Sequence, residues 1–403
     1  MSQKTNPLIV ALDIGSMYTR VLAAELVENS LRYRGHAVMD SAGMRKGLIA
    51  ELAPAIKVVR AAVVEAERSG RNLNISDCAV GVGGPHTWGL NTTGGFDLGS
   101  RMREITRDDV RSAVDRARAV ERPPDRETLH LLHRQFILDE QPGIFDPVGM
   151  IGARLEVDLH ISTCSGSALQ STVTCANRSG VKVSDAVLES LAAAECTLSV
   201  DDRELGVCLL DIGAHSTELA VFFDGAVVHT AAIPIGGMHF TNDLAVGMKM
   251  PLRLAEELKC VYGNAVVTDV PLHLELEVSN PEPQIIRQRA LAEILEPRAR
   301  ELMQYVRRSL QDGGVAEALG SGCVLTGGGA LLTGMLDVVE SQLRVPARIG
   351  QPVRISHLPP DLVHPTFAVA IGTLLYVQRT RAMRAAERPS LRSKLKTMFT
   401  SSF

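Results

Sequence analysis

Residues Ala11–Arg20 read ALDIGSMYTR, and residues Leu209–Leu219 read LLDIGAHSTEL. Both stretches contain an apolar run, then Asp-Ile-Gly, then a few small or polar residues, then a second apolar run. Apolar runs joined by a short turn that contains glycine predict β-hairpins. A single hairpin of this kind is most often a plain turn. Two matched copies, each beginning an αβ segment, predict a fold built from two related halves.

The polar residues at the two hairpin turns are suited to binding phosphate. Glycine after a buried strand lets backbone N–H groups approach an anion without a Cβ in the way. Serine hydroxyls add donors, and an Asp beside such a loop suits hydrated Mg²⁺, which takes one or two carboxylates with phosphates and waters. We therefore expect the hairpins to bind a polyphosphate from both sides. The expected residues are Asp13, Gly15, Ser16, Asp211, Gly213 and Ser216, with Asp13 and Asp211 holding Mg²⁺ through water.

Two later motifs extend this expected site. Val324–Met335 reads VLTGGGALLTGM, a strand followed by a glycine triplet and a helix, which allows close backbone approach to a flat or anionic ligand. In the helix predicted after Pro251, Glu256 and Lys259 stand at i and i+3 on one face. They offer an acceptor and a donor to a ribose and an adenine edge, or they form an ordinary surface ion pair. The Rossmann and P-loop spacings do not occur in the sequence.

Composition excludes several classes of protein. A length of 403 residues predicts two or three domains, and a net charge of −4 argues against a dedicated nucleic-acid binder. The seven cysteines are scattered singly, as expected for small buried side chains in a reducing compartment. The sequence has no signal-peptide pattern and no apolar run long enough to span a bilayer, so we expect a cytoplasmic protein.

The pattern along the chain alternates strands and helices, with one interruption. Helices are predicted at Leu52–Arg68, Thr106–Val120 and Ser184–Leu198. The stretch Val266–Asn280 resembles a strand, and a helix pair or a single helix kinked at Pro297 follows it. A last helix is predicted over His364–Ala386. From Gly83 to about Gly166 the chain is richer in Gly, Thr, Asp and Arg, which indicates an inserted subdomain.

These motifs, in this order, resemble the phosphate-1, phosphate-2 and adenosine motifs of the actin and sugar-kinase superfamily. Within it the chain most resembles the FtsA family of bacterial actin-like cell-division proteins. The resemblance runs nearly end to end, and it is closest in RELGVCLLDIGAHSTELAVFFDGAVVHTAAIPIGG. The inserted region, which includes PVGMIGARLEVDLHISTCSG, and the C-terminal tail are similar to the family as well.

The resemblance implies an α/β, actin-like two-domain fold with a duplicated core around a nucleotide cleft and an FtsA-type inserted subdomain. It implies binding of ATP and Mg²⁺. Glu256 and Lys259 would meet the nucleoside, and Gly327, Gly328 and Gly329 the adenosine. The second phosphate loop would also include Ala214 and His215, with Gly237 beside it. The implied divisions are 1–83 with 167–199, 84–166 (the insertion), 200–240 with 312–386, 241–311 (a small subdomain) and 387–403 (linker and tail).

The resemblance also implies partners and a location. The protein would polymerise on the cytoplasmic face of the bacterial inner membrane, tether FtsZ filaments there, and act as a peripheral protein at the division site. Other division proteins would bind the inserted subdomain, and FtsZ would bind around Thr241–Gln311. No nucleic acid is implied, and the chain is at most a slow ATPase.

Ala214 and His215 depart from the family pattern, and Glu189 is a further candidate residue. Ala214 and His215 replace two glycines that many relatives have in the second loop, which carries a conformational cost if those positions need a positive φ. His215 can instead donate to a phosphate. Glu189 stands where other actin-like proteins place a water-orienting acid, so it is either a hydrolytic residue or a carboxylate on the helix surface.

The tail has a basic amphipathic pattern. Its apolar residues fall at i, i+4, i+7 and i+8, and its basic residues occupy the positions between, which suits the surface of an anionic bilayer. The apolar residues are Leu391, Leu395, Met398 and Phe399, and the basic ones are Arg392, Lys394 and Lys396. The alternative is an ordinary C-terminal helix docked on the body, or a frayed end.

Two other functions compete with the FtsA interpretation. A small-molecule kinase of the same superfamily would need a catalytic Asp in a substrate pocket, and the sequence offers no compelling candidate. An actin-like scaffold of the pilus-assembly PilM type would share an inserted subdomain. The basic amphipathic tail disfavours both.

Overall fold

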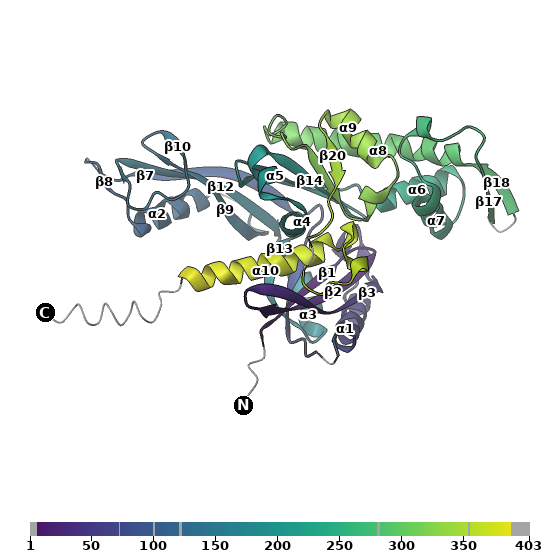
Figure 1. The fold of residues 1–403 in the computed structure, drawn as a ribbon, viewed down its shortest axis with the longest axis horizontal. Helices are drawn as coiled ribbons and strands as arrows, with labels where there is room; N and C mark the ends of the chain where they lie inside the picture. The colour runs from purple at the N-terminus through teal and green to yellow at the C-terminus, as the bar shows by residue number, and fades with distance from the viewer. Residues whose placement is uncertain are drawn as a thin grey trace.

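The computed structural model describes residues 6–71, 73–99, 101–120, 123–279, 283–353 and 355–387. Figure 1 shows an elongated molecule. The inserted strands lie at one end, the small subdomain at the other, and the first half below them. No helix in the described ranges combines the length and apolar character needed to cross a membrane.

The first half is built on a five-stranded sheet. Three antiparallel strands, β1, β2 and β3, form a meander. Strand β6 pairs in parallel with β1, and β13 pairs in parallel with β6, which gives the order β13-β6-β1-β2-β3. The strands are β1 (Leu8–Ile14), β2 (Tyr18–Val27), β3 (Ser30–Asp40), β6 (Asp77–Val82) and β13 (Lys182–Leu188). Helices α1 (Leu52–Ser69) and α3 (Gly166–Arg178) belong to this half, which also carries the short hairpin β4–β5 (Met44–Arg45 and Leu48–Ile49).

The second half repeats this arrangement. Its sheet has the order β16-β15-β14-β19-β20, again with an antiparallel meander and two strands that pair in parallel. The strands are β14 (Val207–Ile212), β15 (Thr217–Phe223), β16 (Ala226–Ile233), β19 (Cys323–Thr326) and β20 (Ala347–Ile349). The duplication predicted from the two hairpins is confirmed, because each hairpin forms the first two strands of its sheet.

Helices α4 (Glu189–Thr197) and α10 (Ala368–Glu387) pack against each other at the centre of the molecule. A Cβ on Gly372 of α10 would lie 1.7 Å from the carbonyl oxygen of Ala192, so only glycine permits this approach. Both helices contribute to a core that also includes buried side chains of β1 and β14. The two halves therefore share one apolar core beneath the cleft.

The inserted subdomain is a four-stranded antiparallel sheet with one helix. Its strands have the order β10-β9-β12-β7, and α2 packs on β7 and β12 over a separate apolar core. The elements are β7 (Trp88–Asp97), α2 (Arg107–Arg118), β9 (Arg126–Leu138), β10 (Gln141–Ile144) and β12 (Arg154–Ser165), with a small ribbon of β8 (Arg103–Glu104) and β11 (Ile151–Gly152). Thr106 caps α2 in a reciprocal capping box with Asp109, as the sequence predicts for a helix beginning there.

The small subdomain is mainly helical and lies at the opposite end (Figure 1). It contains α6 (Gly237–Gly247), α7 (Leu252–Tyr262), the hairpin β17–β18 (Glu275–Ser279 and Pro283–Arg287) and α8 (Gln288–Asp312). The remaining helices of the second half are α5 (Val200–Leu205) and α9 (Met335–Leu343).

Three sequence predictions of secondary structure need correction. The helix predicted over Ser184–Leu198 is wrong in its first part, because residues up to Leu188 form strand β13 beside β6. The strand predicted over Val266–Asn280 shortens to β17. Of the two alternatives around Pro297, the helix pair is wrong: the region is a single helix, α8, with Pro297 inside it, because buried apolar residues on both sides of the proline hold it against the second-half core.

Six of the seven cysteines are buried, as predicted from their apolar surroundings. The exception is Cys260, which is exposed on α7.

Candidate nucleotide cleft

A cavity of about 410 Å³ lies between the two halves. Ligand sites of small molecules commonly have volumes of this order, about 300–1,000 Å³. Residues from many separate segments of the chain line it. They include every cleft residue singled out from the sequence: Asp13, Gly15, Ser16, Glu189, Asp211, Gly213, Ala214, His215, Ser216, Gly237, Glu256, Lys259, Gly327, Gly328 and Gly329.

The first hairpin brings a buried ion pair to the cavity. Arg20 lies directly opposite Asp13 across the hairpin, and its Nη1 is 3.2 Å from Asp13 Oδ2. The Arg20 guanidinium also faces the rings of Tyr18 and Phe367. Its Nε is buried without a hydrogen-bond partner among the described residues. A donor left unsatisfied in this position suits an anionic ligand.

The turn of this hairpin requires glycine. A Cβ on Gly15 would lie 2.8 Å from the Tyr18 carbonyl oxygen, closer than real Cβ contacts. The Gly15 carbonyl accepts a hydrogen bond from the Ser41 hydroxyl at 2.7 Å, which fixes the turn from outside.

The second hairpin is tied to the start of α6. The Gly213 N–H donates to the Ser216 carbonyl at 2.9 Å and closes the turn. The N–H groups of Gly237 and Met238 donate to the carbonyls of Gly213 and Ala214, at 2.9 and 2.7 Å. The turn and the helix N-terminus therefore form one unit beside the cavity.

Neither Ala214 nor His215 has a positive φ. The conformational cost expected if these positions needed glycine is therefore absent. The centres of the His215 and His239 rings lie 6.5 Å apart. Burial lowers the pKa of His215, and the nearby His239 lowers it further. His215 Nδ1 is buried and has no hydrogen-bond partner in the described chain.

The glycine triplet shows three different requirements. Gly327 has a φ of +80°, and a Cβ there would lie 2.4 Å from Asp211 Oδ1. A Cβ on Gly329 would lie 2.3 Å from the Ile212 side chain. At Gly328 the nearest atom would be Thr366 Cγ2 at 3.8 Å, which is ordinary contact. Gly327 and Gly329 thus allow the loop to pack on β14, whereas Gly328 leaves free space in the cavity.

Glu256 and Lys259 form a network rather than a surface ion pair. Lys259 Nζ donates to Glu256 Oε2 at 2.7 Å, to the Gly237 carbonyl at 3.1 Å and to the Thr241 hydroxyl at 2.9 Å. The Thr241 hydroxyl also donates to Glu256. Burial opposes ionisation of Glu256, but hydrogen bonds from Lys259 and Thr241 outweigh it and lower the pKa. The pair joins α7 to the start of α6 at the cavity wall.

Four carboxyl groups gather at the cleft: Asp13, Glu189 and Asp211 line the cavity, and Glu218 is close enough to Glu189 and Asp211 to interact with both. Burial raises the pKa of each, and repulsion from neighbouring acids adds to it at Glu189, Asp211 and Glu218. The pKa of Asp211 rises to about 7 and that of Glu218 to about 8. The positive charge of Arg20 acts in the opposite direction at Asp13 and Asp211, but it offsets only part of the increase in their pKa values.

A cluster of carboxyl groups that burial and mutual repulsion keep from ionising fits a divalent cation bound together with phosphates, because a cation stabilises their charged form. The described residues include no ready-made group of three or more metal-ligating side chains. A cation that keeps most of its waters and takes one or two carboxylates, as Mg²⁺ does, matches this donor set better than a cation that needs a full protein cage.

Glu189 is the first residue of α4, and it lines the cavity. The hydrolytic alternative requires this position at the cleft, but the position alone does not decide between the two alternatives. Its role in hydrolysis stays a prediction.

Arg20 and Glu218 were missed in the sequence. Glu218 lies opposite Asp211 across the second hairpin, as Arg20 lies opposite Asp13 across the first. Both are charged residues inside apolar strands, seven positions after the Asp of the Asp-Ile-Gly motif. Hairpin register was the signal that could have identified them.

Comparison with known proteins agrees with this geometry. Residues 208–372 match the family model described as Cell division protein FtsA, and residues 84–163 match the SHS2 domain inserted in FTSA. The chain is 34% identical to the Cell division protein FtsA of Pseudomonas aeruginosa over 93% of this chain and 90% of the relative. It is 31% identical to that of Escherichia coli over 94% of this chain and 92% of the relative.

The chain belongs to the FtsA family of cell division proteins. The resemblance inferred from the motifs is therefore confirmed, and the family match favours it over the kinase and pilus-scaffold alternatives.

Solved structures of actin-like proteins share the fold. The PilM–PilN type IV pilus biogenesis complex matches with a TM-score of 0.65 at 16% identity, over 91% of this chain and 98% of that one. MreB 5 of Spiroplasma citri bound to AMPPNP matches with a TM-score of 0.55 at 14% identity, over 94% of this chain and 98% of that one. The predicted actin-like two-domain fold with an FtsA-type insertion is confirmed.

The residues predicted to bind membrane fall outside the described residues. They are Leu391, Arg392, Lys394, Leu395, Lys396, Met398 and Phe399.

Proposed function

We propose that the chain binds ATP with Mg²⁺ in the cleft between its two halves. One observation carries the proposal: motif residues from six separate segments of the chain line a single cavity. The two hairpins flank its acidic floor, and the glycine triplet and the Glu256–Lys259 network form other parts of its wall. Actin-like relatives in fold bind ADP and AMPPNP, which supports a nucleotide here.

The residues of the cleft have distinct roles in this proposal. Arg20 and His215, which have unsatisfied donors or acceptors, contact phosphate oxygens, together with backbone N–H groups and the hydroxyls of Ser16 and Ser216. Mg²⁺ offsets the charge of the phosphates and of Asp13 and Asp211. Lys259 and Glu256 contact the nucleoside, and Gly328 lets the adenosine lie close to the backbone. Glu189 orients the attacking water if ATP is hydrolysed, which at most happens slowly.

We further propose that the protein is a membrane tether for FtsZ. It polymerises through its actin-like body on the cytoplasmic face of the bacterial inner membrane, at the division site. Self-association is supported by fold relatives such as the MamK double helical filament. A short basic amphipathic tail binds an anionic bilayer weakly on its own, and a filament that carries many tails gains avidity.

The proposed partner surfaces are those that the resemblance to the FtsA family implies. FtsZ binds the small subdomain around Thr241–Gln311, and other division proteins bind the inserted subdomain. Nucleic acid is no partner, in keeping with the net negative charge of the chain.

Flotation with fluorescent FtsZ polymers and anionic lipid vesicles tests the tether. The full chain should carry FtsZ to the vesicle fraction, and a version that ends at Glu387 should leave both proteins at the bottom. Leu395→Glu should weaken flotation strongly, because it places a charge on the apolar face of the tail. Ser393→Glu is the matched control, since it makes the same charge change on the polar face.

Equal flotation of the full and shortened chains would contradict membrane binding by the tail. Flotation of the full chain without FtsZ would contradict the tether but leave membrane binding in place.

A further inference from the structure

Glu218 connects the cleft to the inserted subdomain. It lies on β15 of the second half and is only 3% exposed. Its Oε1 accepts a hydrogen bond from the Gly84 N–H at 2.5 Å. Gly84 is the residue at which the match to the SHS2 domain begins, so a side chain of the second half holds the first residue of the insertion.

Two glycines make this contact possible. A Cβ on Gly83 would lie 2.1 Å from Glu218 Oε1 and 2.2 Å from Glu189 Oε2, so both carboxyl groups press on this backbone. Gly84 has a φ of +104°, which L side chains rarely adopt. Because Glu189 lines the cavity, the phosphate side of the cleft and the first residues of the insertion meet at Gly83.

The two ends of the insertion are joined just beyond this point. The His86 carbonyl accepts hydrogen bonds from the Ser165 N–H at 3.2 Å and from Arg126 Nη1 at 2.8 Å. The strands that leave and re-enter the first half are therefore held together close to Gly84.

The insertion also rests on the second half, although it emerges from the first. Asn91 Nδ2 on β7 donates to the Val228 carbonyl at 2.8 Å, and His160 on β12 hydrogen-bonds the Thr230 hydroxyl at 2.9 Å. On the other side, His130 Nε2 on β9 accepts the Leu188 N–H at 2.9 Å. The subdomain thus bridges both halves and must respond when they move relative to each other.

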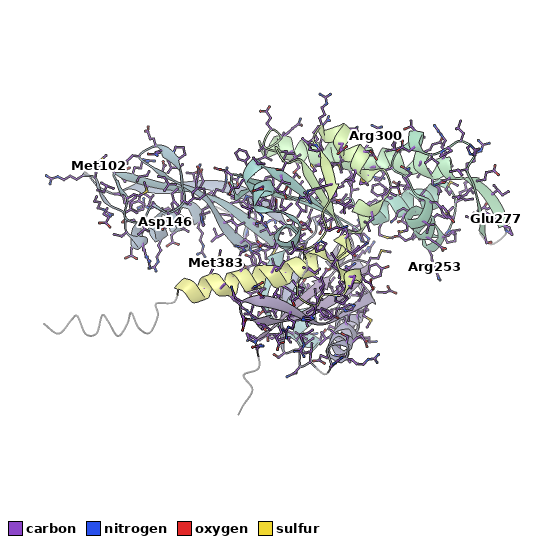
Figure 2. All side chains as sticks on the ribbon, in the orientation of Figure 1. Met102, Asp146, Arg253, Glu277, Arg300 and Met383 are labelled. Carbon is purple, nitrogen blue, oxygen red and sulfur yellow. The ribbon has the colours of Figure 1, made fainter. Side chains whose placement is uncertain are left out.

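We propose that Glu218 is a positioning residue that couples occupancy of the cleft to the placement of the inserted subdomain. A ligand that draws the halves together shifts β15 relative to β6, and the bond from Glu218 to Gly84 carries this shift to the insertion. Figure 2 shows Met102 and Asp146 at the far end of the subdomain, where a small rotation at its base gives the largest displacement. The inference rests on the proposed nucleotide function of the cleft.

Hydrogen exchange of the full chain, measured with and without Mg·ATP, tests this coupling. In the wild-type chain, Mg·ATP should slow exchange in the two hairpins and also in Trp88–Asp97 and Arg154–Ser165. Glu218→Ala should speed exchange at Gly84 by roughly 10- to 100-fold without ligand, the loss expected for a bond to a carboxylate. It should also abolish the response of the insertion while the hairpins still respond.

Two variants control for misfolding and loss of charge. Glu218→Gln keeps an acceptor for the Gly84 N–H and should restore most of the coupling. Glu204→Ala removes an exposed acid of the same half and should behave as wild type.

Wild-type exchange at Gly84 in Glu218→Ala would overturn the inference. So would a wild-type chain that binds Mg·ATP in the cleft without any response in the insertion. A wild-type chain that binds no nucleotide would instead refute the proposed function, and the coupling with it.

Discussion

A methyl group at Gly328 should weaken nucleotide binding without harming the fold. Gly328 lines the cavity, and a Cβ there would meet only Thr366 Cγ2, at 3.8 Å. Its φ is not positive, so alanine adopts the backbone without strain. Replacing glycine by alanine at a compatible position stabilises a protein by about 0.4–1 kcal/mol through the unfolded chain. The free energy of unfolding should therefore stay the same or rise slightly.

The same methyl group occupies the space proposed for the adenosine. Overpacking a well-fitted site costs about 1–3 kcal/mol, which corresponds to roughly a 5- to 150-fold increase in Kd. Calorimetric titration with Mg·ATP and scanning calorimetry on the same sample measure the two effects separately.

Gly327→Ala is the matched control because it changes the neighbouring glycine of the same triplet. Its φ of +80° costs alanine about 1–2 kcal/mol. Its Cβ would also lie 2.4 Å from Asp211 Oδ1, so this variant should lower the melting temperature clearly. If Gly328→Ala keeps wild-type affinity while remaining folded, the glycine triplet does not face the nucleotide and the reasoning fails.

Two further predictions concern the cleft. His215→Gly should raise the Kd for Mg·ATP several-fold in calorimetry, because it removes the imidazole that is proposed to contact a phosphate and relieves no backbone strain. Tighter binding by this variant would show that the ring obstructs the site. The pKa values of Asp211 and Glu218, raised to about 7 and about 8, imply that the folded chain holds protons which the unfolded chain releases near pH 4. In urea titrations without nucleotide, the free energy of unfolding should therefore fall between pH 6 and pH 8, and Asp211→Asn should flatten this dependence; a rise over this range would contradict it.

The sequence predicted the hairpins and their duplication because the signals are local. Asp-Ile-Gly between apolar runs marks a turn, and the polar residues beside it, within ten positions. Thr106 likewise marked the start of α2 with its own side chain. Such features depend on neighbours in the chain, so they survive without knowledge of the fold.

The features that the sequence did not predict depend on contacts between segments that are distant in the chain or on the backbone conformation. Ser184–Leu188 carries no strong strand pattern, and it becomes a strand because β6 lies beside it. Arg20 and Glu218 are ordinary charged residues until the hairpin register places each opposite an Asp at the cleft floor. The expected cost at Ala214 and His215 could be judged only once φ was known.

Calorimetric titration of the full chain with Mg·ATP tests the central claim, that the two hairpins bind one nucleotide between them. The account predicts one site per chain for the wild type and clearly weaker binding for both Asp13→Ala and Asp211→Ala, one change in each half. The absence of binding to the wild-type chain, or unchanged affinity in both folded variants, would contradict it.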